Sequence, residues 1–286
     1  MADSRTALQN GELGRCLDEL KKEIRTAPTD AEKRVFLFQL YSVIGDWDKA
    51  QTQLDVCRDL SSKHSSMAQT YEQVLQCERL RSAVFKGTQS PTILGEPSQW
   101  IGLLQQALKL AAANDWSGFS SMQVDAFEQA NATPGKIYLE AKDAQGEPSE
   151  GIPFEWIADA DMRFGPVLEV IVNGRYFWIP IENIESIEIE KPVDLRDLVW
   201  VPARFYWKNQ GEAVGFIPTR YPGSEQSADD HVRLAKITSW EEPTEGVYIG
   251  SGMRTLSTDS QDFSIAEIRR IVFENVEDAA DSDAAN

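Results

Sequence analysis

The sequence pattern changes at "ATPG" (132–135), and this change limits the possible folds more than any other feature of the chain. Upstream, apolar residues recur at the i, i+3, i+4, i+7 spacing of helices, whereas downstream short β-branched and aromatic runs are broken by Gly and Pro, as strands are. A chain of 286 residues is long enough for two domains. We therefore predict a helical domain over 1–133, an α+β domain over 134–275 and an acidic disordered tail over 276–286.

The helical part repeats itself after 34 residues, which is the period of tetratricopeptide repeats. Gly11, Leu13, Cys16 and Leu20 recur as Gly45, Trp47, Ala50 and Leu54. The next step of 34 lands on Arg79 and Arg81, so the pattern predicts two TPR-like units of an α-α superhelix rather than a long array. Further helices are expected at about 66–85, at 99–112 behind a Ser98 cap, and at 115–130.

Seven runs after Gly135 are predicted to be strands: "IYLEA", "IPFEWI", "VLEVIV", "RYFWIPI", "ESIEIE", "RFYWK" and "AVGFIP". Asn173-Gly174 between the third and fourth runs indicates a hairpin, because both central residues of a type I′ turn need positive φ. In "ESIEIE" the isoleucines face one way and the glutamates the other, so one side of the sheet is expected to be wet. We predict a mixed, barrel-like sheet, with "SADDHVRLAK" as a short helix capped at Ser227.

The stretch "DLRDLVWVPARFYW" (194–207) combines charged and aromatic residues in an unusual way. Its first part, two aspartates around an arginine, predicts a single helical turn. Trp200, Phe205 and Trp207 belong to a strand that Pro202 interrupts, and because proline cannot donate to a sheet ladder, the strand is expected to lie on an edge or at a bulge. The aromatic residues then form either a corner of the core or a surface for a partner.

The formal charge of −18 is unevenly distributed along the chain. Each part has 14 Lys and Arg, against 17 acidic residues in 1–133 and 29 in 134–286, which leaves −3 and −15. An acidic field repels phosphate backbones, so we expect no nucleic-acid partner and favour basic protein surfaces; the alternative is that the acidity serves only solubility. No apolar run approaches the roughly 20 residues of a membrane helix and no signal peptide is evident, so we expect a cytoplasmic protein without a membrane partner.

The segment "DADMRFGPVLE" (159–169) carries a cluster of charged side chains that could bind a cation or perform acid–base chemistry. As a calcium loop it fails at the fifth, sixth and twelfth positions. We predict a structural network of Asp159 and Asp161 with Arg163. The alternative is a hydrolase or cation-dependent enzyme that uses Asp159, Asp161 and Glu169, with Arg220, and whose carboxyl pKa values are pushed apart by burial in a deep polar pocket.

Other catalytic and cofactor signatures are weak or lacking in the sequence. The histidines, His64 and His231, belong to no recognisable triad, no Walker A loop is present, and "GSGMRT" supplies two of the three glycines of a dinucleotide motif. The three cysteines, Cys16, Cys57 and Cys77, contain no C-x-x-C pair, as expected for reduced structural thiols. The sequence therefore predicts no catalytic residue, no metal site and no cofactor.

An ordered series of stretches resembles the ImpE family, whose members are also called TagJ or SciE-type proteins and are accessory components of some bacterial type VI secretion systems. The series, over about residues 11–273, is "GDWDKA", "FEWIADADMRFGP", "GRYFWIP", "LRDLVW", "IPTRYPGSE", "ITSWEE" and "GSGMRTL". The resemblance implies a cytoplasmic, non-enzymatic protein with a helical N-terminal domain and an α+β domain. It also implies association with the small contractile-sheath subunit of the TssB or VipA type and, through it, with the AAA+ ATPase ClpV.

These inferences give a first hypothesis, an adaptor that binds a helix of the sheath subunit either in the concave face of the helical domain or against the acidic α+β domain. The candidate partner-binding residues are the aromatic anchors Tyr176, Trp178, Trp200, Phe205 and Trp207, with Asp159, Asp161, Arg163 and Arg220 as the charged residues beside them. The enzyme described above is the second hypothesis. A third is a purely structural scaffold, in which surface substitutions leave every interaction intact.

Overall fold

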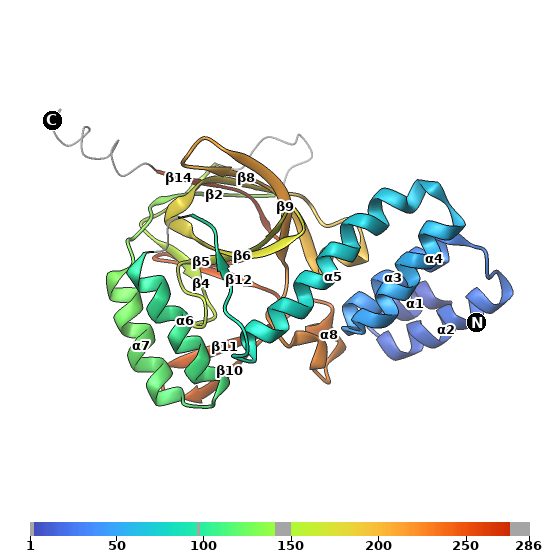
Figure 1. Cartoon of the computed structure of the whole chain (residues 1–286), viewed down its shortest axis with the longest axis horizontal. Coiled ribbons are helices and arrows are strands. Elements are labelled where there is room, and N and C mark those ends of the chain that lie inside the picture. The colour runs from blue at the N-terminus through green and yellow to red at the C-terminus, as the bar shows by residue number, and fades with distance from the viewer. Residues whose placement is uncertain (1–2, 96–97, 141–149, 275–286) are drawn as a thin grey trace.

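The helices occupy the first part of the chain and are followed by a sheet-rich part (Figure 1). The computed structural model describes residues 3–95, 98–140 and 150–274. The helices are α1 (Ser4–Gln9), α2 (Leu13–Thr26), α3 (Ala31–Ile44), α4 (Trp47–Leu60), α5 (Ser65–Phe85), α6 (Gln99–Ala112), α7 (Trp116–Gln129) and α8 (Asp230–Arg233). The periodic pattern predicted α2 to α7 correctly to within a few residues. It missed α1, which at six residues is too short to show a helical period.

Aspartates begin several of these helices by accepting a hydrogen bond from the backbone three residues ahead. Asp30, Asp46 and Asp115 cap α3, α4 and α7 in this way. The predicted cap Ser98 does occupy the N-cap position of α6, but its side chain makes no capping bond. The predicted Ser227 cap was wrong, because the N-cap of α8 is Asp229, two residues further on.

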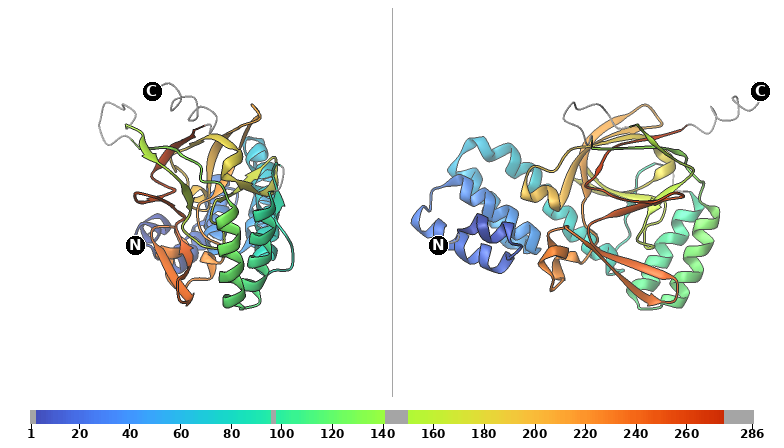
Figure 2. Two further views of the ribbon diagram at one scale, coloured as in Figure 1. Left: turned by 90° about the vertical axis from the view of Figure 1, so that its left-hand side faces the viewer. Right: turned by 180° about the vertical axis from the view of Figure 1, so that it is seen from behind.

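A nine-stranded sheet forms the body of the second part. Its strands are β1 (Thr92–Ile93), β2 (Gly135–Leu139), β3 (Ile152–Phe154), β5 (Val167–Val172), β6 (Arg175–Pro180), β7 (Ile184–Ile189), β8 (Trp200–Trp207), β9 (Glu212–Pro218) and β14 (Ile268–Phe273). Their order is β1-β6-β5-β9-β8-β7-β14-β2-β3, antiparallel except for β1 with β6. The sheet is mixed and strongly curved, as predicted (Figure 2). It is not closed, however, since β1 and β3 do not pair with each other in the part of the chain that the structure describes.

Two small sheets complete the strand content. They are a hairpin of β10 (Thr238–Thr244) and β11 (Val247–Gly252), and a three-stranded sheet of β4 (Ile157–Asp159), β12 (Thr255–Thr258) and β13 (Asp262–Ser264). None of the strands after residue 218 was predicted. The segment between α5 and α6 contains β1, which is only two residues long. The expected acidic tail lies outside the described residues.

Two local predictions in the sheet have clear outcomes. Asn173 and Gly174, with φ of 51° and 69°, form the turn between β5 and β6, which confirms the hairpin. Pro202, in contrast, lies in the interior strand β8, opposite Phe216 of β9. The Pro202 carbonyl accepts a hydrogen bond from the Glu190 backbone N–H, and Glu190 is the first residue after β7. Proline's missing N–H therefore faces the place where the pairing of β7 with β8 ends, and no bond within the paired strands is lost. The prediction of an edge strand was therefore wrong.

The sheet separates two hydrophobic clusters. Its concave face holds one cluster, which includes Ile137, Val170, Ile179 and Phe205. Its outer face packs against α5 and joins the core of the N-terminal helices in a second cluster, to which the sheet contributes Ile171, Tyr176, Trp178 and Trp200. Beyond α5 the outer face is wet, as predicted, because the isoleucines of β7 are buried while its glutamates are exposed. Successive helices pack in pairs, but a TPR-like superhelix stays a prediction.

Candidate functional site

A buried ion network joins the helices to the sheet. Arg254 is fully buried between Asp159 and Glu169 and donates to both carboxylates, while its Nε donates to the Pro218 carbonyl (2.9 Å). From α5, Arg81 also reaches Glu169, through Nε to Oε1 (2.8 Å) and Nη2 to Oε2 (2.7 Å). Glu169 of β5 is thus shared by two arginines that lie 88 positions before and 85 positions after it in the sequence.

Aromatic side chains provide the remaining donors of this network. The Tyr176 hydroxyl donates to Glu169 Oε1 (2.5 Å) and accepts from Trp178 Nε1 (2.7 Å). On the other side, the Tyr221 hydroxyl donates to Asp159 Oδ1 (2.9 Å). Every carboxylate oxygen of Glu169 and Asp159 therefore accepts at least one hydrogen bond from the chain itself. Buried charges need such pairing, because removing them from water without partners is very costly.

The pKa values of the Glu169 and Asp159 carboxyl groups shift in opposite directions. Burial alone raises the pKa of Glu169, but Arg81 and Arg254 outweigh burial and hold it at about 2. Burial raises the pKa of Asp159 to about 7 against the attraction of Arg254. Separated pKa values were expected of the enzyme hypothesis. Yet Glu169 is 0% and Asp159 4% exposed. Asp159 does line a groove between α7 and β4, but its carboxylate oxygens, like those of Glu169, already accept hydrogen bonds from the chain, which disfavours a role in catalysis.

The other charged residues of the predicted cluster also bind their own chain. Asp161, fully buried, accepts from the Arg163 side chain and from the Gly250 backbone N–H (2.9 Å). Arg220 donates to the Val43 carbonyl (2.7 Å) at the end of α3, where a cation complements the helix dipole. The predicted network is confirmed only in part: Arg163 pairs with Asp161, but Asp159 pairs with Arg254, and the two central arginines, at 81 and 254, were missed. Among the described residues, no group of three or more His, Cys, Asp or Glu side chains is placed to hold a metal ion.

The repeated glycines of the helical part meet one segment of the sheet-rich part. Gly11 and Gly45, with φ of 77° and 81°, occupy equivalent turns. A Cβ on Gly45 would lie 2.4 Å from Glu225 Cγ, and a Cβ on Gly11 would lie 3.2 Å from His231 Cε1. The neighbouring Asp230 accepts from the first backbone N–H of α2. Segment 224–231 is therefore packed against both repeat turns, a contact that the 34-residue spacing alone did not reveal.

The predicted partner-binding residues fall into two groups. Seven are at most 4% exposed and contact their own chain: Asp159, Asp161, Tyr176, Trp178, Trp200, Phe205 and Arg220. These side chains present almost no surface to a partner in this structure, because each is buried among other parts of the chain. Arg163 and Trp207 remain partly exposed. Arg163 lies over the Phe85 ring (5.3 Å from its guanidinium carbon to the ring centroid). Among the aromatic residues of the set, Trp207 is the one that lines a groove.

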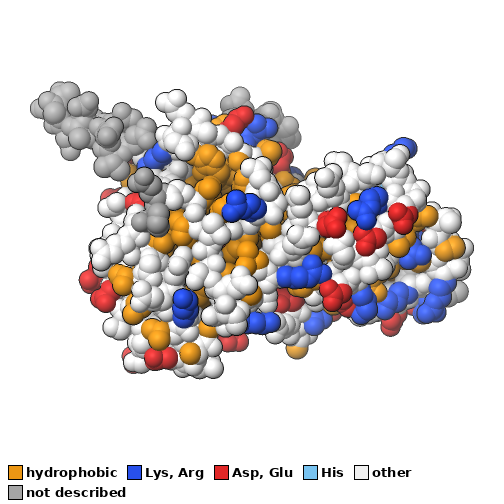
Figure 3. Space-filling model, in the orientation of Figure 1, with side chains coloured by type: hydrophobic (Ala, Val, Ile, Leu, Met, Phe, Trp, Pro, Cys, Tyr) orange, Lys and Arg blue, Asp and Glu red, His pale blue; other side chains and the backbone are white. Residues whose placement is uncertain are grey.

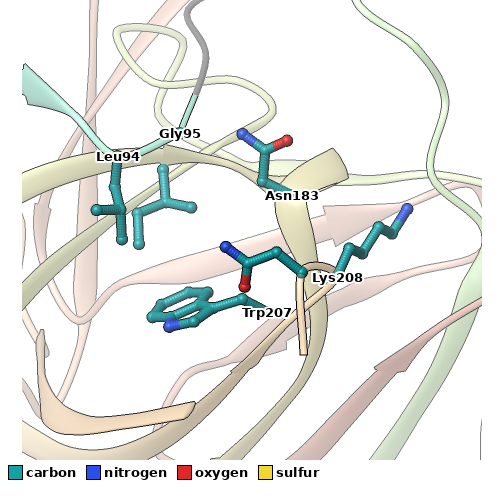
Figure 4. Close-up of a pocket in the computed structure, with 7 residues that line it drawn as sticks. Leu94, Gly95, Asn183, Trp207 and Lys208 are labelled. Atoms are coloured by element: carbon teal, nitrogen blue, oxygen red, sulfur yellow. The ribbon is translucent and has the colours of Figure 1, made fainter. Parts of the chain in front are cut away.

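The Trp207 groove has a volume of about 590 Å³, within the range of ligand-binding pockets (Figure 4). Besides Trp207 it is lined by Leu94, Gly95, Ile179, Asn183, Lys208 and Asn209. Trp207 ends β8 and is stacked on Phe205 (5.3 Å between ring centroids), while Leu94 is fixed by a bond from its N–H to the Trp178 carbonyl (3.0 Å). Three segments far apart in the sequence thus supply a firm apolar wall.

The surface around the sheet differs from that of the helices. On the face that Figure 3 shows, hydrophobic side chains gather over the sheet-rich part, whereas charged side chains are denser over the N-terminal helices. A second groove of about 410 Å³ lies between α7 and β4 and includes Phe127 and Trp156. In the residues described, no helix combines the length and the apolar character needed to cross a membrane.

Comparison with known proteins gives a consistent result. A family described as "ImpE protein" matches residues 151–272. Over 267 residues the chain is 42% identical to the "Type VI secretion system accessory component TagJ" of Pseudomonas aeruginosa, with 93% of this chain and 89% of that protein covered. A crystal structure of a protein from Vibrio parahaemolyticus is similar with a TM-score of 0.82 over 95% of this chain and 97% of that one. At 23% identity, this last similarity establishes the fold alone.

Proposed function

Because the chain belongs to the ImpE family and is an accessory component of type VI secretion, we propose that it acts as a non-enzymatic cytoplasmic adaptor. In this proposal it binds a helical segment of the small contractile-sheath subunit, of the TssB or VipA type. The sheath subunit in turn links it to ClpV. The sheath subunit and ClpV are partners that the family resemblance implies. The structure offers a groove in which such a helix could bind.

The Trp207 groove is the observation that carries the proposal. Its apolar wall of Leu94, Ile179 and Trp207 suits the hydrophobic stripe of an amphipathic helix, which is the usual helix-in-groove mode of recognition. The buried network holds β5 against α5 and reaches β6, which carries Ile179, through Tyr176 and Trp178, so little ordering of this side of the groove is needed on binding. A preformed groove on a rigid support is typical of an adaptor.

The enzyme hypothesis has less support. It needs Asp159, Asp161 and Glu169 to be open to a substrate, and instead each is paired with an arginine. The scaffold hypothesis is consistent with the rigid junction but gives no reason for a partly exposed tryptophan at a groove. It predicts that substitution of Trp207 leaves every interaction intact, which makes Trp207 the residue that separates the two hypotheses.

The test is isothermal titration calorimetry of the full chain with a synthetic peptide of the sheath subunit's helical segment. We expect Trp207→Ala to weaken binding at least 10-fold, since truncating a buried aromatic anchor typically costs about 2 kcal/mol or more. Trp240→Ala is the matched control, because Trp240 is 41% exposed on β10 and does not line the groove. Equal affinities of the two variants would contradict this site, and no heat with the wild-type chain would contradict the partner.

The link to ClpV is tested separately by co-purification from cells. We expect ClpV to be recovered with the chain only when the sheath subunit is present. Recovery of ClpV from cells that lack the sheath subunit would show a direct contact and would contradict the proposed order of assembly.

A further inference from the structure

The Trp207 groove contains a hydrogen-bond donor that has no partner in the part of the chain that the structure describes. Asn183 Nδ2 is buried and has no hydrogen-bond partner among the described residues. It lies against Gly95, where an added Cβ would come within 2.7 Å of it, and Figure 4 shows its nitrogen on the side of Leu94 and Gly95. Buried polar groups are nearly always satisfied, so an unsatisfied one in a groove points to a ligand with an acceptor.

The other polar groups of the groove are donors as well. Asn209 uses its Oδ1 to accept from the Gly211 backbone N–H (3.0 Å), which leaves its amide N–H groups for a ligand. Lys208 is exposed and is part of the lining, and its ammonium end points away from Leu94 and Trp207 in Figure 4. None of the described residues that line the groove is Asp or Glu. The groove therefore combines an apolar wall with donors and one positive charge.

We propose that the groove receives the C-terminal turn of its helical partner. This inference rests on the function proposed above and adds the direction in which the helix enters. The last four carbonyls of a helix have no intrahelical partner, and that end carries a partial negative charge. Carbonyls of the last turn would accept from Asn183 and Asn209, the charge would favour Lys208, and apolar side chains of the same turn would contact Trp207.

The opposite direction does not fit the same groove. A helix N-terminus presents unpaired N–H groups and partial positive charge, and it needs acceptors or carboxylates. Among the described residues, the carboxylate nearest in sequence to the lining, Glu182, is not part of the lining and already accepts hydrogen bonds from Ser98, Trp100 and Asn131. An N-terminal turn would leave its own donors facing those of Asn183 and Lys208.

Direction is measured by nuclear magnetic resonance, with a nitroxide attached to one or the other end of the synthetic sheath peptide. We expect the C-terminal label to broaden the Trp207 indole N–H resonance of the full chain strongly, and the N-terminal label to leave it sharp. The reverse pattern, or equal broadening, overturns the proposed direction while leaving the proposed function intact. Absence of binding to the wild-type chain overturns both.

Two substitutions test the donors. Asn183→Leu should weaken peptide binding about 3- to 10-fold, the effect of one lost hydrogen bond, and because Nδ2 has no partner among the described residues the Tm should stay equal or rise. Lys208→Met should weaken it about 2- to 5-fold at low salt, with Lys136→Met, an exposed lysine on β2 outside the groove, as the unchanged control. Wild-type affinity in Asn183→Leu, with Trp207→Ala still impaired, would contradict the donor role but not the groove.

Discussion

Replacing Arg81 by methionine should destabilise the whole chain, because Arg81 connects α5 to the sheet through a buried carboxylate. Methionine keeps the apolar stem and removes the guanidinium, together with two bonds to Glu169 and one to the Arg220 carbonyl (3.0 Å). Losing one partner of a buried ion pair usually costs about 3–5 kcal/mol. Glu169 keeps Arg254 and Tyr176, so we expect about 3 kcal/mol, the lower end of that range.

The assay is urea denaturation followed by circular dichroism and tryptophan fluorescence. Arg79→Met is the matched control: it lies on the same helix and pairs with Asp48 at 2.8 Å, but the Arg79 and Asp48 side chains are 41% and 93% exposed. Exposed pairs contribute less than about 1 kcal/mol. If the free energies of unfolding of Arg81→Met and Arg79→Met differ by less than about 1 kcal/mol, the buried network is not what joins α5 to the sheet.

Two further predictions concern the repeat turn and pH. Gly45→Ala should lower the free energy of unfolding by about 2 kcal/mol, because φ is 81° and the new Cβ meets Glu225, whereas Gly14→Ala in α2, with no atom in the way, should raise it by about 0.5–1 kcal/mol. The pKa of Asp159 in the folded chain, about 7, lies above its ordinary value of 3.8. The contribution of Asp159 to the free energy of unfolding is therefore full below about pH 4 and is lost as the pH rises through 7. The urea midpoint should therefore fall between pH 5 and 8, and less steeply in Asp159→Asn; a midpoint that rises over this range would contradict the assigned pKa.

Elements that depend on residues close together in the sequence were predicted correctly. Helices α2 to α7 follow from apolar periodicity, and the β5–β6 turn follows from Asn173-Gly174. Of the strands that were missed, β10 was missed for a physical reason. The side chains of β10 are largely exposed on both faces and include Pro243, so no alternation of polar and apolar residues marks it as a strand.

For the buried ion network, the sequence predicted the types of residue but not which of them pair. The sequence indicated an Asp/Arg network around Asp159, but Arg254, which binds it, lies 95 positions away and no spacing rule connects them. Burial of Trp178 and Trp200 could not be distinguished from an interface role, because large aromatic residues suit both. The groove was not predictable, since the pairing of β1 with β6 brings Leu94 to Ile179, while Trp207 comes from β8, which is not a neighbour of either strand in the sheet order.

The short parallel pairing of β1 with β6 affects how the polypeptide can be divided. Residues 92–93 precede α6 and α7 yet form one margin of the large sheet, and Ala107 and Phe119 of those helices share a cluster with Val247 of β11. The backbone therefore passes from the N-terminal helices to the large sheet at β1, continues into α6 and α7, and returns to the sheet at β2. A protease that cleaves only between residues 131 and 134 should nick the molecule without releasing two pieces, which would migrate as one particle until denaturant is added.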